Sequence, residues 1–379
     1  MIVREWTRIG CTGFGGPPAH IALLRRLCVT RRAWIPADDF EQAIAVTNLL
    51  PGPASTQLAI YCAWRLRGRP GAVLGGICFI VPGLVLILAL SALFLASHPP
   101  LWVAGAAAGA GAAVPAVAVH AAYGLAPASR RHAGKARAAR IRWLCYLAVG
   151  ALGAVLLGPY LVLVLLGCAL VEMYARTGRP RPGTGRRPAM SVPAALPLAG
   201  ATGGLLALAW VALKVGALSY GGGFVIIPLM QHDAVHTYHW MTAAQFLDAV
   251  ALGQVTPGPV VQTVAVVGYA AAGIGGGLLA ATIAFTPSFC FVLLGARHFE
   301  RLRGNDRAQA FLSGAGPAAI GGIAGAALPL GLSLAHLWQV GVLAAAVLVL
   351  FVARRGVVPA LLGAGALGVI AALAGAAVN

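Results

Sequence analysis

Long apolar runs separated by short polar segments cover most of the chain. Residues 72–96 and 101–125 contain no Asp, Glu, Lys or Arg, and residues 141–157 contain one. Each run approaches the length of about 20 residues that a helix needs to cross a bilayer. Strands of a membrane barrel would instead alternate apolar and polar positions. The pattern therefore predicts an all-α polytopic membrane protein.

Composition supports this class. The chain has 379 residues, of which 60% are hydrophobic and 9% charged, so too few polar groups exist to cover a soluble globule. The N-terminal segment MIVREWTRIG lacks an apolar core followed by a small-residue cleavage site, so no removed signal peptide is expected. We expect a multi-pass protein of the inner (plasma) membrane, with the lipid bilayer as its main partner.

Basic residues outnumber acidic ones by 27 to 9, but they form short clusters between the apolar runs. Such clusters are typical of topology signals and do not suggest nucleic-acid binding. The seven cysteines form no C-x-x-C pair, so neither a disulfide nor a thiolate metal site is expected. His232, His236 and His239 have passable spacing for a metal, but we interpret them as an outward-facing loop without one.

The chain contains an internal repeat. A shift of 206 positions aligns Gly15-Gly16 with Gly221-Gly222, Trp34 with Trp240, and the P-G-P motif at 51–53 with the one at 257–259. We predict a duplication with a first repeat at 1–175, a basic Arg/Pro/Gly-rich cytoplasmic linker at 176–197, and a second repeat at 198–379.

Positive charge is distributed in complementary fashion in the two repeats. The first carries basic clusters at 25–32, 65–69 and 130–142, whereas the matching loops of the second carry no Lys or Arg. Conversely, the clusters at 297–307 and 354–355 match uncharged turns of the first repeat. Since Lys and Arg mark cytoplasmic loops, the two repeats are expected to be inverted in the membrane. Each would contribute about five transmembrane helices and a re-entrant helical hairpin broken at P-G-P.

The P-G-P motifs break otherwise helical segments. The arms at 37–50 and 54–64 in the first repeat, of 14 and 11 residues, are each too short to span comfortably. Pro53 and Pro259 suit the first turn of a helix, so each motif is predicted to close one helix and open another. The segments TGFGGPPAH and SYGGGFVIIP break the first helix of each repeat in the same way. Converging half-helix ends near the midplane predict an anion site.

Several charged residues join this hypothesis. Lys214 lies in an apolar run and aligns with Arg8, so both are candidates for balancing an anion, with snorkelling to the membrane surface as the alternative. Glu41 and Asp248 lie on the equivalent arms before P-G-P and are proton-coupling candidates. His20 is a candidate to carry a proton or to donate a hydrogen bond to an anion. The alternative is a structural histidine whose ring nitrogens are hydrogen-bonded to neighbouring residues.

The segments IGCTGFGGPPAHI and LLPGPASTQLAI, with SYGGGFVIIP and VTPGPVVQT in the second half, resemble the chromate ion transporter (CHR) family in its long, two-domain form. The resemblance implies export of chromate and with it chromate resistance, sulfate as a related substrate, and possible proton coupling. The resemblance also implies binding residues, which in this chain are Phe14, Gly15, Gly16, Pro17, His20, Pro51, Gly52, Pro53, Ser55, Thr56 and Gln57. The second repeat adds Tyr220, Gly221, Gly222, Pro257, Gly258, Pro259, Gln262 and Thr263 as predicted binding residues.

Two positions depart from the family pattern. Gly13 stands where a serine is more usual, and Asn48, a further candidate site residue, where a glutamine is more usual.

Two other functions stay open: a carrier for sulfate or another anion, and a membrane enzyme. The enzyme is disfavoured because the chain has no nucleotide or flavin fingerprint, so no cofactor is expected. A homodimer is one possible assembly.

Overall fold

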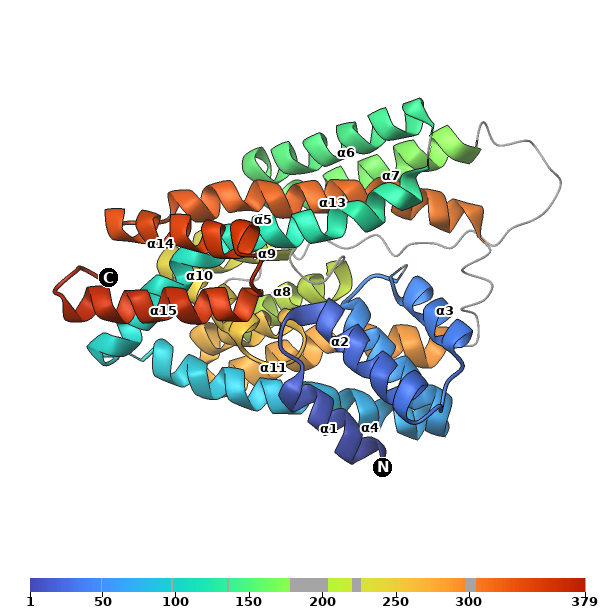
Figure 1. The fold of residues 1–379 in the computed structure, drawn as a ribbon, viewed down its shortest axis with the longest axis horizontal. Coiled ribbons are helices and arrows are strands. Elements are labelled where there is room, and N and C mark those ends of the chain that lie inside the picture. Colours follow the sequence, from blue (N-terminus) through green and yellow to red (C-terminus); the bar gives the residue numbers. More distant parts are fainter. Residues whose placement is uncertain are drawn as a thin grey trace.

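A computed structural model of the protein describes residues 1–48, 50–96, 98–134, 136–177, 204–219, 226–296 and 305–378. Within these ranges the chain forms helices and turns and no β-strand, in agreement with the predicted all-helical class. Figure 1 shows the helices lying roughly alongside one another in one bundle. Most of the predicted linker, from 178 onward, lies outside the described residues.

The first half contains α1 (Ile2–Thr12), α2 (Gly16–Arg25), η1 (Arg26–Arg31), α3 (Ala37–Thr47), α4 (Ala54–Phe94), α5 (Leu101–Ala133), α6 (Arg137–Leu156), η2 (Gly158–Tyr160) and α7 (Leu161–Thr177). The second contains α8 (Leu205–Leu218), α9 (Ile227–Gln231), η4 (His232–Thr237), α10 (Ala243–Val255), η5 (Val260–Gln262), α11 (Thr263–Gly295), α13 (Asp306–Leu332), α14 (Leu337–Val347), η7 (Leu348–Val352) and α15 (Val357–Leu373).

Among the described residues, 5 helices are long and apolar enough to cross a membrane: Ala54–Phe94, Leu101–Arg131, Arg137–Leu156, Val260–Gly295 and Asp306–Leu332. Shorter apolar helices cover Leu205–Leu218, Leu337–Val352 and Val357–Leu373. The three runs that the hydrophobic pattern singled out correspond to the second part of α4, to α5 and to α6.

The predicted helix breaks occur in both halves. Helix α1 ends at Thr12 and α2 begins at Gly16 with prolines in its first turn; α3 ends at Thr47 and α4 begins directly after Pro53. In the second half α10 ends at Val255, and η5 and α11 follow Pro259. Proline is tolerated in these places because the first N–H groups of a helix have no intrahelical acceptor.

Further irregularities recur at equivalent positions, to within one residue of the 206-residue shift, and were not expected from the sequence. Helix α4 kinks at Gly68 and α11 at Gly273, which divides them into α4a (54–66) and α4b (69–94), and α11a (263–271) and α11b (274–295). The π-helices η1 and η4 also occupy positions that are 206 residues apart. Equivalent backbone distortions in both halves indicate that the repeat extends from sequence to local conformation.

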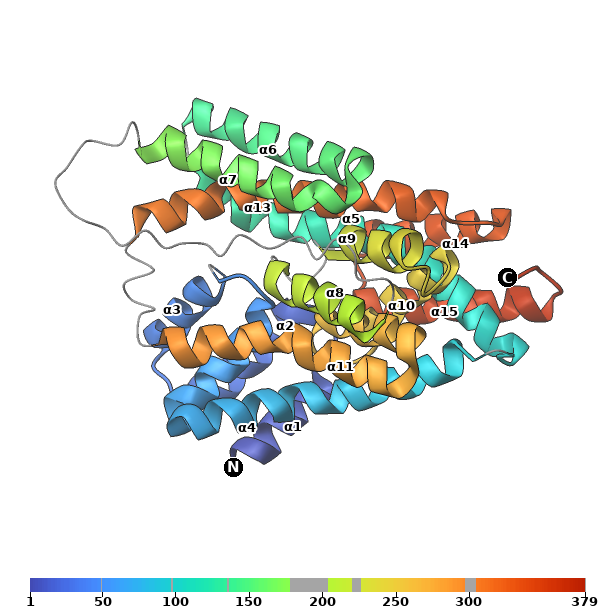
Figure 2. The ribbon, with the colours of Figure 1, turned by 180° about the vertical axis from the view of Figure 1, so that it is seen from behind.

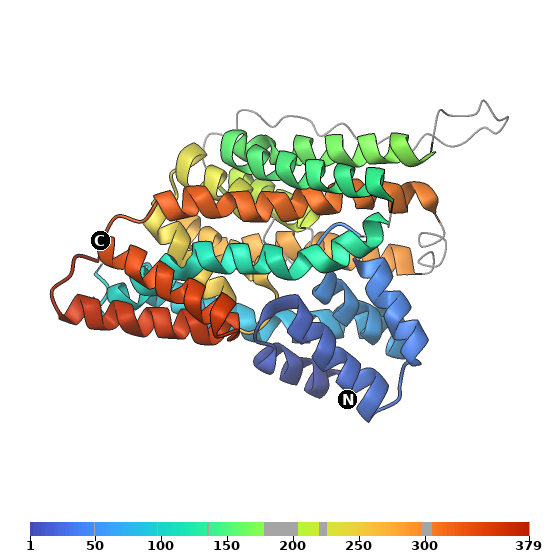
Figure 3. The ribbon, with the colours of Figure 1, turned by 45° about the horizontal axis from the view of Figure 1, so that its top comes forward.

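The two halves interleave. Helices α6 and α7 of the first half pack on α13 of the second, and α14 and α15 of the second pack on α5 of the first. Figure 2 shows α6 and α7 beside α13, and Figure 3 shows the dark red α14 and α15 next to α5. Close packing depends on small residues: a Cβ added at Gly150 or Gly321 would overlap the backbone of the facing helix.

Equivalent helices of the two halves run in opposite directions. Helix α5 runs from the loop at 95–100 toward α6, whereas α13 starts near the end of α5 and runs back toward the C-terminus (Figure 1). The junction between α5 and α6, the end of α7 and the start of α13 therefore lie at one end of the molecule. These are segments in which the sequence places basic residues of both halves.

Candidate functional site

The two P-G-P turns and the two first-helix breaks contact one another through backbone hydrogen bonds. The N–H of Gly52 donates to the carbonyl oxygen of Ser219 at 2.8 Å, and the N–H of Gly258 donates to that of Gly13 at 3.0 Å. Ser219 is 206 residues after Gly13, as Gly258 is after Gly52, so the two bonds are equivalent. Each turn is thus held by the break of the opposite half.

The turn glycines have backbone conformations that other residues rarely adopt. The φ angle is +112° at Gly52 and +107° at Gly258. A Cβ at Gly52 would also lie 2.6 Å from Gln57 Nε2 and 3.2 Å from Ser288 Oγ. At Gly258 the corresponding atom would lie 3.1 Å from Gln262 Oε1. Glycine is therefore required both for the turn and for the close approach of neighbouring polar groups.

Buried polar atoms without a hydrogen-bond partner gather around these turns. Within the described part of the chain they include Thr56 Oγ1, Gln57 Oε1, Ser219 Oγ, Gln254 Nε2, Gln262 Oε1 and Ser288 Oγ. Buried polar groups are nearly always hydrogen-bonded in folded proteins, so such a group of exceptions requires an explanation. Four of the six are hydroxyl oxygens or an amide nitrogen, which can donate hydrogen bonds to an oxyanion.

The two glutamines hold the turns through their amide nitrogens. Gln57 Nε2 donates to the carbonyl oxygen of Pro51 at 2.6 Å, and Gln262 Nε2 donates to that of Ile80 on α4b at 2.8 Å. Both side chains are fully buried. Thr263 turns inward as well, but its hydroxyl donates to the carbonyl oxygen of Val260.

His20 connects the first break to the start of α4a. Its ring is fully buried, with Nε2 2.8 Å from the carbonyl oxygen of Gly13 and Nδ1 3.2 Å from Ser55 Oγ. Gly16, at the start of α2, lies close to Val260, since a Cβ there would be 3.6 Å from Val260 Cγ2. The first break therefore contacts both P-G-P helices.

Other predicted residues lie at the edge of this group. Phe14, Gly15, Asn48 and Pro51 are exposed, Pro17 is half-buried, and Pro53, Pro257 and Pro259 are buried. Tyr220, Gly221 and Gly222 lie outside the described residues. Their predicted role therefore stays a prediction.

The predicted counter-charges have different surroundings from those expected. Lys214 Nζ is bound to Asp233 Oδ2 at 2.6 Å and lies 5.8 Å from the ring centre of Trp210. Its charge is already compensated in this conformation, which the sequence argument did not include. Arg8 is exposed on α1.

The two acidic candidates also differ from each other. Glu41 forms an ion pair with Arg25 at 3.0 Å in which both side chains are about half exposed. Asp248 packs against α5, where a Cβ at Gly111 would lie 2.9 Å from Asp248 Oδ1. Of the two, Asp248 is the more enclosed.

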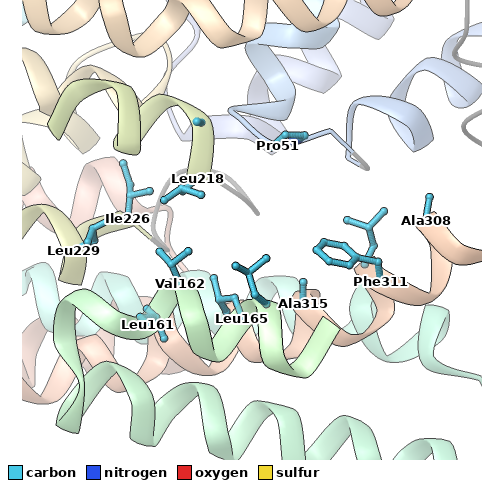
Figure 4. Close-up of a pocket in the computed structure, with 13 residues that line it drawn as sticks. Pro51, Leu161, Val162, Leu165, Leu218, Ile226, Leu229, Ala308, Phe311 and Ala315 are labelled. Atoms are coloured by element: carbon cyan, nitrogen blue, oxygen red, sulfur yellow. The ribbon is translucent and has the colours of Figure 1, made fainter. Parts of the chain in front are cut away.

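An apolar cavity of about 330 Å³ adjoins the first P-G-P turn (Figure 4). Its walls come from both halves, with Pro51 beside Leu218 of α8, Leu165 of α7 and Phe311 of α13. The lining is almost entirely hydrocarbon. Such a cavity does not suit a dianion, so the polar atoms around the turns are the better candidates for binding one.

Ser219, Gln254 and Ser288 were not among the sequence-predicted residues. A signal for Ser288 exists in the repeat: Pro82-Gly83 in α4b matches Pro287-Ser288 in α11b once the one-residue difference between the two kinks is allowed for. Gly83 lies against the second P-G-P turn and Ser288 against the first. Sequence alone did not reveal that these positions contact the turns of the opposite half.

Comparison with known proteins agrees with this arrangement of motifs. The sequence model of the family described as chromate transporter matches residues 1–173 and 206–370. The chain belongs to the chromate transporter family. This confirms the resemblance carried by the G-G-P and P-G-P motifs, and it makes the protein a multi-pass membrane transporter by family and by fold.

Three relatives illustrate the similarity. A chromate transport protein of Cupriavidus metallidurans is 33% identical over 338 residues, covering 87% of this chain and 82% of the relative. A chromate transport protein of Pseudomonas aeruginosa is 31% identical, covering 85% and 78%. A probable chromate transport protein of Synechococcus elongatus is 29% identical, covering 89% and 85%. No solved structure matches the chain.

Proposed function

We propose that the protein exports chromate from the cytoplasm across the inner membrane and binds the anion between its two P-G-P turns. The observation that carries this proposal is the group of buried, unpartnered polar atoms where two helix starts and two glycine turns meet. Helix N-termini attract anions because their free N–H groups and the helix dipole both favour negative charge. Family membership and the names of the relatives favour chromate.

We further propose that the two repeats are inverted in the membrane and that access to this site alternates between the two sides. The reciprocal bonds from Gly52 and Gly258, the opposite directions of α5 and α13, and the interleaved packing are expected of two halves related by an axis in the membrane plane. On this topology the P-G-P hairpins are re-entrant, and the basic clusters that the sequence places at 130–142 and 297–307 face the cytoplasm. Outward movement of a dianion is favoured by roughly 2 × 2.3 kcal/mol per 100 mV of inside-negative potential.

Sulfate is the second candidate substrate. It is also a tetrahedral dianion, and the hydroxyl and amide groups around the turns would donate to its oxygens in nearly the same geometry. The transport experiment therefore measures chromate flux both without and with sulfate as a competitor.

The experiment is flux in proteoliposomes that contain the purified full-length protein, with membrane potential and pH gradient imposed separately. We expect chromate flux that rises with a potential driving the anion outward and that is inhibited by excess sulfate. Gly52→Leu should abolish the flux by filling the approach to Gln57 and Ser288. Gly167→Leu on α7, where a Cβ meets open space, is the matched control. Flux equal to that of empty liposomes, from protein that is folded and inserted, would contradict the proposal.

A further inference from the structure

The contacts of His20 fix which of its ring nitrogens carries a proton. Nε2 lies 2.8 Å from the carbonyl oxygen of Gly13, and a carbonyl oxygen can only accept. Nε2 must therefore be the protonated nitrogen and donate this bond. In a neutral ring Nδ1 is then an acceptor, and its partner at 3.2 Å is the Ser55 hydroxyl.

The state of the ring decides what Ser55 can do. Beside neutral His20, the Ser55 hydroxyl donates its one proton to Nδ1 and has none for an anion. When the ring is protonated, both nitrogens donate, and Ser55 Oγ becomes the acceptor of the bond from Nδ1. The Ser55 proton is then free to point elsewhere.

Ser55 lies where a donor to an anion would be needed. It occupies the first turn of α4a, directly before Thr56, whose hydroxyl can donate and lacks a partner in the described chain. The Gly13 carbonyl that holds His20 also accepts from the N–H of Gly258 in the second P-G-P turn. The ring therefore contacts groups tied to both turns.

We propose that protonation of His20 converts Ser55 into a hydrogen-bond donor to the oxyanion, so that one proton and one anion bind together. The inference deepens the proposed chromate transport and rests on it. One proton is taken from solvent onto Nδ1 for each anion bound, and no covalent bond is made or broken in the substrate. A dianion then crosses with a net charge of minus one, and the proton moves in the same direction.

Other ionisable groups near His20 do not account for this coupling. The recorded contacts of the ring are Gly13, Ser55 and Phe79, none of which titrates, and the segment 254–268 of the second turn carries no ionisable side chain. Several cations on the elements packed around it are exposed to solvent, namely Arg4 and Arg8 on α1, Arg26 and Arg31 on η1, and Arg67 and Arg69 on α4. The others form ion pairs with acids: Arg25 with Glu41, Arg32 with Glu5 and Arg65 with Asp39. The thiols of η1 and α4a, Cys28 and Cys62, are buried and interact with each other.

The test is calorimetric binding of sulfate and of chromate to the purified full-length protein at a series of pH values between about 5.5 and 8.5. Sulfate stays a dianion throughout this range, so its binding reports protons taken up by the protein alone. Two buffers of different ionisation enthalpy give the number of protons. We expect about one proton per anion and an affinity that rises up to about tenfold per unit fall in pH.

Two variants separate this role from a structural one. Ser55→Ala should flatten the pH dependence and hold the affinity at the weak, high-pH value of the unmodified protein. His20→Gln, whose amide can still donate to Gly13, should remove proton uptake. Ser91→Ala is the matched control: Ser91 is a fully buried serine of α4b whose hydroxyl donates to the carbonyl oxygen of Ile87, and its loss should leave the pH profile unchanged.

Either of two results would overturn the inference: anion binding without proton uptake in the unmodified protein, or full proton uptake in Ser55→Ala. Both leave the transport proposal standing. A folded protein that binds neither chromate nor sulfate at any pH would instead contradict the proposed function itself.

Discussion

Ser288 is a buried hydroxyl without a hydrogen-bond partner in the described chain, and it lies near Gly52 and Gln57 of the opposite half. An unsatisfied buried polar group costs about 1–3 kcal/mol, so Ser288→Ala should stabilise the substrate-free protein by about 1 kcal/mol. If the hydroxyl serves the anion, the same change should weaken chromate binding by about tenfold. Thermal unfolding with and without chromate measures both effects.

Ser91→Ala again provides the comparison, because the Ser91 hydroxyl is satisfied within its own helix. That variant should gain no stability and keep its chromate-induced stabilisation. An Ser288→Ala protein with unchanged chromate binding would remove Ser288 from the site.

Gly52 and Gly258 support a second prediction at the same scale. Gly52→Ala places a Cβ at a φ of +112° and 2.6 Å from Gln57 Nε2, which strains the turn and displaces the glutamine from Pro51. We expect chromate flux to fall by more than about tenfold, with a similar loss for Gly258→Ala. Gly124→Ala, in α5 with open space around the added carbon, should keep normal flux. Normal flux in both turn variants would show that close backbone approach is not needed.

Between elements, the ion pair of Lys214 on α8 with Asp233 on η4 modifies the sequence hypothesis. Removing one partner of a buried pair leaves the other uncompensated, so Lys214→Gln should destabilise the protein and also weaken transport. If Lys214 acts on the substrate, Lys214→Gln/Asp233→Asn should recover stability but not chromate affinity. Recovery of both would assign the lysine a structural role. Unfolding temperature and the half-saturation concentration for chromate distinguish these results.

Much of the element order could be predicted from sequence because proline and glycine act locally. The P-G-P and G-G-P segments ended and started helices where expected, since proline lacks the N–H that a helix interior needs. The kinks at Gly68 and Gly273 and the contact of Ser288 with the first turn were missed. Those features depend on which helix of one half packs against the other, and no local pattern encodes that pairing.

At the scale of the whole molecule, basic residues are concentrated at one end, and this predicts which loops face the cytoplasm. If the repeats are inverted, the loop at 95–100 and the connection at 333–336 face the same side, opposite to the α5–α6 junction. Single cysteines introduced in a cysteine-free protein at His98 and at Ser333 should react with an impermeant thiol reagent from outside. One at Arg137 should react only after permeabilisation. Labelling of His98 and Ser333 from opposite sides would contradict the inverted arrangement.

The central claim is that one chromate ion binds between the two P-G-P turns, and the position of chromium in the protein tests it most directly. Anomalous diffraction at the chromium edge, from crystals of the full-length protein grown with chromate, locates the metal without reference to the surrounding atoms. We predict one peak in contact with side chains from both halves, Thr56 and Gln57 on one side and Ser288 or Gln262 on the other. A chromium peak away from both turns, in protein that transports chromate, would contradict the account.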